Sequence, residues 1–96
     1  MVITWQGARI DTRECEKLAQ RITSDWRGGW LYTEYMLLSP GGKILYYRVG
    51  NWRRGMSGEC RGWWWASQNY GVSLDGYTVL DREALVNMRL IKPEEA

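Results

Sequence analysis

Histidine is absent from the 96-residue sequence, and its absence removes several kinds of chemistry at once. Histidine titrates near neutral pH, activates serine and cysteine nucleophiles, and is the commonest metal ligand in proteins. The only cysteines, Cys15 and Cys60, are too few to build a four-ligand zinc site. The sequence therefore predicts a protein that is not an enzyme and that holds no metal and no other cofactor.

Two partial motifs fall short of an active site. The glycines of residues 50–57 have the spacing of a phosphate-binding P-loop, but Met56 stands where that loop needs a lysine. Glu34 and Glu59 could form the carboxylate pair of a glycosidase, yet a chain of 96 residues has little volume for a sugar-binding cleft. Neither motif changes the expectation of a protein without catalysis.

Long apolar runs are also missing. Residues 1–9 lack the charged start and apolar run of a secretory signal, and no stretch of about 20 uncharged apolar residues occurs in the sequence. Two cysteines are too few for the disulfide framework of a small secreted protein. We therefore expect a cytoplasmic protein without a membrane segment, folded as a single domain over residues 1–96.

The clearest predicted element is an amphipathic helix over about residues 12–26. Asp11 precedes Glu14 by three residues, as in a capping box, and Gly28 or Gly29 would end the helix. Apolar residues recur at helical spacing within it: Cys15, Leu18, Ala19, Ile22 and Trp26. This spacing predicts that the Trp26 indole is buried, so that Trp26→Ala would lower stability by about 3 to 5 kcal/mol.

The segments on either side favour strands. Residues 2–10 predict a short strand, bulged at Gly7. Residues 30–38 and 43–49 predict an antiparallel hairpin around a type II turn at residues 39–42. Within the second of these strands, alternation favours a core face with Leu45, Tyr47 and Val49 and leaves Tyr46 and Arg48 on the opposite face.

The last third predicts shorter elements. The glycine-rich residues 50–62 suggest a loop or a splayed hairpin connection, and residues 63–70 suggest an aromatic strand. Asp75 and Gly76 mark a turn before a short strand at residues 77–80. Asp81 could cap a final helix, although residues 84–91 could equally form a last strand.

Together these elements predict an α+β fold, in which one amphipathic helix packs on a mostly antiparallel sheet of four to five strands. A short C-terminal helix would be added if residues 82–91 are helical. Helices on one face of such a sheet leave its other face free, and an uncovered aromatic face is where a binding surface would lie.

Aromatic residues and arginine dominate the middle of the chain. Seven tryptophans and six tyrosines occur without any phenylalanine, so every ring carries a polar group. Residues 26–65 carry six positive and two negative side chains. Tryptophan, tyrosine and arginine are the residue types that dominate interface hot spots. The predicted partner-binding residues are Tyr46, Arg48, Trp52, Arg53, Arg54, Arg61 and Trp64.

Two binding functions fit these residues. In the first, the aromatic and arginine-rich surface docks on another protein or a nucleoprotein complex. In the second, the rings stack on the bases of a single-stranded nucleic acid while the arginines contact phosphates. A net charge of +2 is low for a nucleic-acid-binding domain and favours the first. A homodimer could also form by strand addition at residues 30–49.

In size and composition, though in no diagnostic motif, the chain resembles the small inhibitor proteins of phages and mobile elements, anti-CRISPR proteins among them. That resemblance implies a non-catalytic protein that acts in the host cytoplasm. It also implies a partner that is a larger host complex, on which the small protein blocks a nucleic-acid site.

Overall fold

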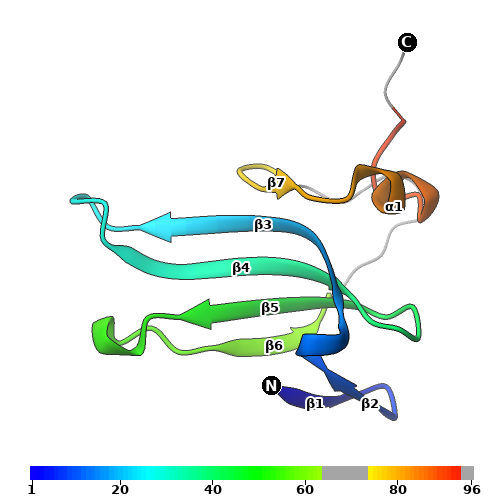
Figure 1. Ribbon diagram of the computed structural model, residues 1–96, viewed down its shortest axis with the longest axis horizontal. Helices are drawn as coiled ribbons and strands as arrows, with labels where there is room; N and C mark the ends of the chain where they lie inside the picture. Colours follow the sequence, from blue (N-terminus) through cyan, green and yellow to red (C-terminus); the bar gives the residue numbers. More distant parts are fainter. Residues whose placement is uncertain (64–73, 94–96) are drawn as a thin grey trace.

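The computed structural model describes residues 1–63 and 74–93. Its main body is a five-stranded antiparallel sheet in the order β6-β5-β4-β3-β7 (Figure 1). The strands are β3 (Glu16–Ser24), β4 (Trp30–Leu38), β5 (Ile44–Gly50), β6 (Glu59–Gly62) and β7 (Thr78–Val79). Because β3 to β6 follow one another both in the chain and in the sheet, they form a meander.

Short elements flank this sheet. Before it come the strands β1 (Val2–Trp5) and β2 (Ala8–Asp11), which pair as a separate hairpin. The helical elements are η1 (Thr12–Glu14), η2 (Trp52–Arg54) and α1 (Arg82–Asn87). No helix in the described part of the chain is long and apolar enough to cross a bilayer.

The structure confirms the predicted fold class, a mostly antiparallel α+β domain with one short C-terminal helix. Residues 84–91 do not form the alternative last strand, because Arg82–Asn87 form the helix α1. Asp81 caps that helix, because its Oδ1 accepts the backbone N–H of Ala84 at 3.0 Å. Leu85 on the inner side of α1 is fully buried.

The helix predicted over residues 12–26 is wrong. Only Thr12–Glu14 are helical, and Glu16–Ser24 form β3, which pairs with β4 on one side and β7 on the other. The register between β3 and β4 shifts between Lys17 and Ala19, which marks a β-bulge at Leu18. The bulge lets Leu18 and Ala19 enter the same core, and this adjacent apolar pair imitates the spacing of a helix.

Trp26, predicted to be in the core, lies in the turn between β3 and β4 and is 86% exposed. We therefore expect Trp26→Ala to change the free energy of unfolding by less than about 0.5 kcal/mol. Urea denaturation checks this, with Leu18→Ala as the matched control. Leu18 is fully buried, so its truncation should lower stability by about 2 to 5 kcal/mol. A loss of that size for Trp26→Ala would contradict the turn.

Two turns also differ from their predictions. The strand expected over residues 2–10 is a hairpin, because Gln6 and Gly7 both adopt positive φ, at 50° and 79°, as a two-residue turn of type I′ requires. Between β4 and β5 the positive φ belongs to Gly42, at 86°, and not to Gly41, so the expected type II turn does not form. The predicted β4–β5 hairpin itself is confirmed.

The later predictions are mostly confirmed. Within the predicted connection at residues 50–62, residues 51–58 join β5 to β6, and the last four residues form β6. The turn at Asp75 and Gly76 and the short strand after it are present. The strand predicted at residues 63–70 lies outside the described residues except for Trp63, whose backbone N–H donates to the carbonyl of Ile44.

The two faces of the five-stranded sheet are covered by different elements. We call the face on which α1 packs the helix face, and its buried residues are Leu18, Ala19, Met36, Leu85 and Leu90. We call the face that the β1–β2 hairpin covers the hairpin face, and its buried residues are Ile10, Leu37 and Leu45. Since both faces are covered in part, Leu45 and Tyr46 are both buried although they point to opposite faces.

Candidate docking surface

Two loops meet at the end of the sheet that lies at the left of Figure 1. The turn between β3 and β4 carries Asp25, and the loop after β5 carries Asn51 and Arg54. The Arg54 guanidinium contacts the Asp25 carboxylate at 2.7 Å. The Asn51 side-chain amide donates to the carbonyl of Trp30 at 2.9 Å. These contacts fix the two loops to each other.

Asp25 also organises its own turn. One of its carboxylate oxygens accepts the backbone N–H groups of Arg27 at 2.9 Å and Gly29 at 2.8 Å. The hydrogen bond from Arg54, followed by these two backbone hydrogen bonds, lowers the pKa of the Asp25 carboxyl below its ordinary value. Asp25 is therefore ionised near neutral pH and holds both loops in one arrangement.

The joined loops and the first residue of β4 present three indoles to solvent. Trp26 is 86% exposed, Trp52 is 77% exposed and Trp30 is 38% exposed. The Arg27 guanidinium lies 4.4 Å from the centre of the Trp26 ring, and that of Arg53 lies 5.4 Å from the centre of the Trp52 ring. We call these residues the tryptophan tip: Trp26, Arg27, Trp30, Trp52 and Arg53.

The two arginines of the tryptophan tip form no ion pair within the described residues, so their charge is available to a partner. Among residues 1–63 and 74–93, no carboxylate lies within ion-pair distance of Arg27 or Arg53. Large apolar rings beside unneutralised guanidinium groups are the composition of interface hot spots. The chemistry available at this tip is therefore recognition by burial and by charge.

The structure places the predicted site residues in two groups. Trp52 and Arg53 belong to the tryptophan tip, and Arg54 lies beside them in its ion pair with Asp25. Sequence reasoning missed Trp26, Arg27 and Trp30 at the tip. Helical spacing assigned Trp26 to the core, and Trp30 was taken only as the start of a strand. The signal that could have found Trp26 and Arg27 is turn chemistry, since Asp25 is followed by Gly28 and Gly29.

The remaining predicted site residues lie on the helix face or outside the described residues. Tyr46 is 9% exposed, so it is not a surface anchor. Arg48 and Arg61 both contact the carboxylate of Glu59, at 3.5 Å and 3.0 Å. The structure therefore does not bring these three residues to the tryptophan tip. Trp64 falls in the part of the chain that is not described.

Glu34 explains why Tyr46 is buried. Its carboxylate accepts hydrogen bonds from Arg21 at 2.8 Å and 3.1 Å, from the Tyr46 hydroxyl at 2.8 Å and from the Tyr77 hydroxyl at 3.4 Å. Burial alone would raise the pKa of Glu34, but the hydrogen bonds from Arg21 and Tyr46 outweigh burial and the pKa is lowered. Glu34 is thus an ionised, fully partnered carboxylate, which suits a structural role better than a glycosidase acid.

A shallow groove lies on the hairpin face. The rings of Tyr35 and Tyr47 are stacked there with centres 6.0 Å apart and planes 24° apart. The Lys17 ammonium lies 4.6 Å from the centre of the Tyr35 ring. The hollow has a volume of about 380 Å³, and its lining residues are Thr12, Arg13, Cys15, Lys17, Tyr35, Tyr47 and Val49. We call it the tyrosine groove.

The two thiols of the chain also lie on the hairpin face. Cys15 and Cys60 both pack against the buried cluster around Leu37. Burial raises the pKa of each thiol above its ordinary value of 9.0. Both are therefore protonated near neutral pH, which is unsuited to nucleophilic or redox chemistry.

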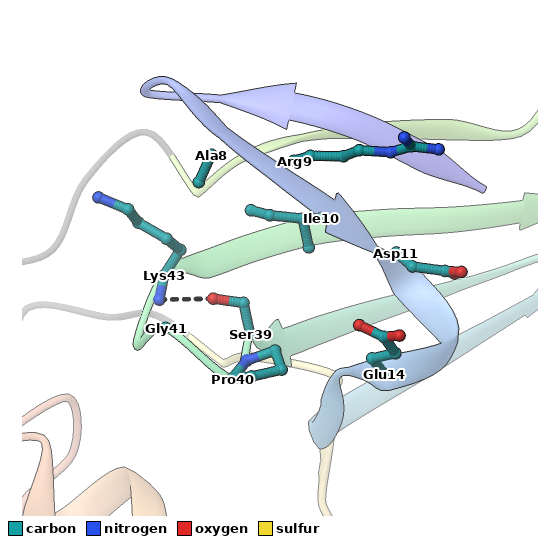
Figure 2. Close-up of a pocket in the computed structure, with 9 residues that line it drawn as sticks. All are labelled: Ala8, Arg9, Ile10, Asp11, Glu14, Ser39, Pro40, Gly41 and Lys43. Carbon is teal, nitrogen blue, oxygen red and sulfur yellow. Dashed lines mark hydrogen bonds between the residues drawn. The ribbon is translucent and has the colours of Figure 1, made fainter.

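A second hollow, of about 320 Å³, lies between β2 and the β4–β5 turn (Figure 2). Figure 2 shows Arg9, Asp11 and Glu14 on its hairpin side and Ser39, Pro40 and Lys43 on its turn side. Hydrogen bonds from Arg13 hold the pKa of Asp11 at about 2, so this carboxyl has no proton to donate near neutral pH. In the described residues no three His, Cys, Asp or Glu side chains gather closely enough to hold a metal ion.

A scan against protein-family models, a search of curated proteins and a search of solved structures find no significant match to this chain. The case for a function therefore comes from the geometry and charge of the described surface.

Proposed function

We propose that this domain is a non-catalytic binding protein that docks its tryptophan tip on a larger protein or nucleoprotein complex. The observation that carries the proposal is the exposure of Trp26 and Trp52 on two loops that are fixed to each other. Burying a large apolar side chain is worth about 1.5 to 3 kcal/mol. Because the loops are already ordered, docking loses little conformational entropy.

Charge favours a protein surface over single-stranded nucleic acid. Phosphate binding needs cations that no carboxylate neutralises. Arg48 and Arg61 share Glu59, and Arg54 pairs with Asp25. Three of the four arginines expected to contact phosphates are therefore partnered within the chain itself.

Single-stranded nucleic acid is the alternative, and one observation supports it. At the tryptophan tip Arg27 lies over Trp26 and Arg53 lies over Trp52, which would pair a stacking ring with a phosphate-binding cation. Fluorescence anisotropy of a labelled 15-nucleotide oligo-dT at two salt concentrations separates the two functions. Affinity that falls steeply with salt would favour nucleic acid.

The resemblance to small phage inhibitors extends the proposal to one kind of partner, a nucleoprotein complex of a host defence system in the cytoplasm. The domain would then compete with the nucleic acid of that complex. Displacement of labelled target DNA from the purified complex by the domain tests this extension, and unchanged DNA binding at saturating domain would contradict it.

A double variant tests the docking function directly. We expect Trp26→Ser with Trp52→Ser to weaken binding of the partner at least about 30-fold, the equivalent of one strong hot spot. The partner is captured from cell lysate with the tagged wild-type domain, purified, and titrated by calorimetry. The melting temperature should stay unchanged, because both indoles are exposed.

Leu80→Ser is the matched control. Leu80 is 45% exposed and lies after β7, so its loss removes exposed apolar surface without touching the tryptophan tip. It should leave the affinity within about twofold, the equivalent of about 0.4 kcal/mol. Equal affinities for wild type and the tip variant would contradict the proposed function.

A further inference from the structure

The floor of the tyrosine groove offers a surface on which an apolar side chain can pack. Tyr35 and Tyr47 are paired in register on β4 and β5, and their half-buried rings are stacked on the same face of the sheet. Such a pair offers flat apolar surface with hydroxyl groups at its edge. The hollow beside it, at about 380 Å³, is open to solvent and shallow, which suits part of a chain better than an enclosed small molecule.

The strands of the five-stranded sheet carry charge of one sign on the hairpin face, while Asp11 and Glu14 lie outside the sheet, near Cys15 at one end of the groove. The carboxylates of the five-stranded sheet are Glu16, Glu34 and Glu59, and strand alternation places all three on the helix face. Lys17 stands on the hairpin face above Tyr35. The other cation of the groove, Arg13, already holds Asp11 at 2.7 Å. Among residues 1–63 and 74–93 no carboxylate lies within ion-pair distance of Lys17, so a ligand in the groove meets an ammonium without an ion-pair partner.

Beyond the groove, exposed apolar side chains continue along the same strands toward the tryptophan tip. Thr33 is in register with Val49 of β5 and with Ile22 of β3, and it accepts a hydrogen bond from the Trp30 indole at 2.9 Å. Ile22 is 59% exposed and Val49 is 36% exposed. At about 3.3 Å per residue, the path from Tyr35 to Trp30 along β4 matches an extended segment of about five residues.

From these three observations we infer that the tyrosine groove receives an extended segment of the partner protein in which apolar side chains alternate with acidic ones. The inference rests on the proposed docking function and specifies the chemistry of the partner. An apolar side chain of the segment lies on Tyr35 and Tyr47, its carboxylate pairs with Lys17, and its far end reaches Trp30 at the tryptophan tip.

Selection from a library of random 12-residue peptides displayed on phage tests the inference. The folded wild-type domain is the bait, and selected peptides are labelled and titrated by fluorescence anisotropy. We expect sequences rich in Asp and Glu next to large apolar residues. Lys17→Glu should weaken their binding at least 10-fold, and replacing the peptide's acidic residues with lysine should restore binding to that variant.

The matched control is Lys43→Glu. Lys43 lies in the β4–β5 turn, donates to Gln6 and does not line the groove, so the same change of charge there should leave peptide affinity unchanged. Lys17 is exposed, and a thermal melt of each variant verifies that its fold is intact.

Several results would overturn the inference. They are a selection that yields no peptide, one that yields basic peptides, and one whose peptides bind Lys17→Glu as tightly as wild type. Displacement of the peptides by 15-nucleotide oligo-dT, with Lys17-dependent binding of that DNA, would assign the groove to nucleic acid instead. If the captured partner loses affinity for the tip variant but not for Lys17→Glu, the docking function stands and the groove assignment falls.

Discussion

Glu34→Leu is expected to lower the free energy of unfolding by about 2 to 3 kcal/mol. The change removes the acceptor on which Arg21, Tyr46 and Tyr77 converge, and Tyr46 is too buried to find water instead. A fully enclosed ion pair would lose more, but the Arg21 side chain is 40% exposed and can be rehydrated. Urea denaturation followed by circular dichroism measures the difference.

Glu59→Gln is the control for this variant. Glu59 also faces two arginines, Arg48 and Arg61, but its side chain is 39% exposed. Such a pair at the surface contributes about 1 kcal/mol or less. If Glu34→Leu were as mild as Glu59→Gln, Glu34 would not be the buried centre of the helix face.

Glu34 also makes the stability of the domain depend on pH. The pKa of Glu34 in the folded state lies below its ordinary value of 4.5, so its contribution is present above that pH and is lost as the pH falls through the folded pKa. Burial and then the Glu34 carboxylate raise the pKa of Tyr46 above 10.0, so the Tyr46 contribution is lost as the pH rises. Denaturation from pH 3 to 7 should therefore show a weaker acid dependence in Glu34→Leu than in wild type.

Gly62→Val should lower the free energy of unfolding by a similar amount, about 2 to 3 kcal/mol. Gly62 ends β6, and the Trp5 indole of β1 lies directly on it, so that any Cβ at this position would overlap the ring. The β1–β2 hairpin would have to lift from the hairpin face, and Ile10 would lose its packing on Leu37 and Leu45. Thermal denaturation measures the loss.

Gly41→Ala is the matched glycine control. A Cβ at Gly41 would meet no atom of the described residues within 4 Å, and the φ of Gly41 is not positive, so stability should stay within about 0.5 kcal/mol of wild type. Trp5→Leu, which shortens the side chain above Gly62, should remove part of the penalty when combined with Gly62→Val. Strictly additive effects of those two substitutions would mean that Trp5 and Gly62 do not touch.

Local sequence signals predicted much of the fold. The sequence Ser39-Pro40-Gly41-Gly42 located the β4–β5 hairpin, and Asp81 located α1 through its cap. β3 was hidden because its bulge at Leu18 gives a helix-like spacing, while its real support is pairing with β4 and β7. Partners that lie elsewhere in the chain leave no local pattern, so propensity was overridden by tertiary pairing.

In the candidate site, too, some residues follow from local sequence and others depend on tertiary structure. Trp52 and Arg53 follow from composition, because a glycine-rich loop with an indole and arginines is a surface feature wherever it folds. The predicted position of Trp26 depended on the element assigned to it. As part of a helix it would lie in the core, but in the observed turn after β3 it lies at the tip. The burial of Tyr46 depends on Glu34 in the neighbouring strand, which alternation within β5 alone does not reveal.

The meander of β3 to β6 also determines the order in which the domain can assemble. Each of these strands pairs with the next one in the chain, so its hairpins close through short loops, on a timescale of about 1 to 10 μs for one hairpin. Leu85 and Leu90, by contrast, reach Leu18 and Met36 from the far end of the chain. During synthesis β3 to β6 are therefore expected to pair first and to leave Met36 uncovered until α1 leaves the ribosome.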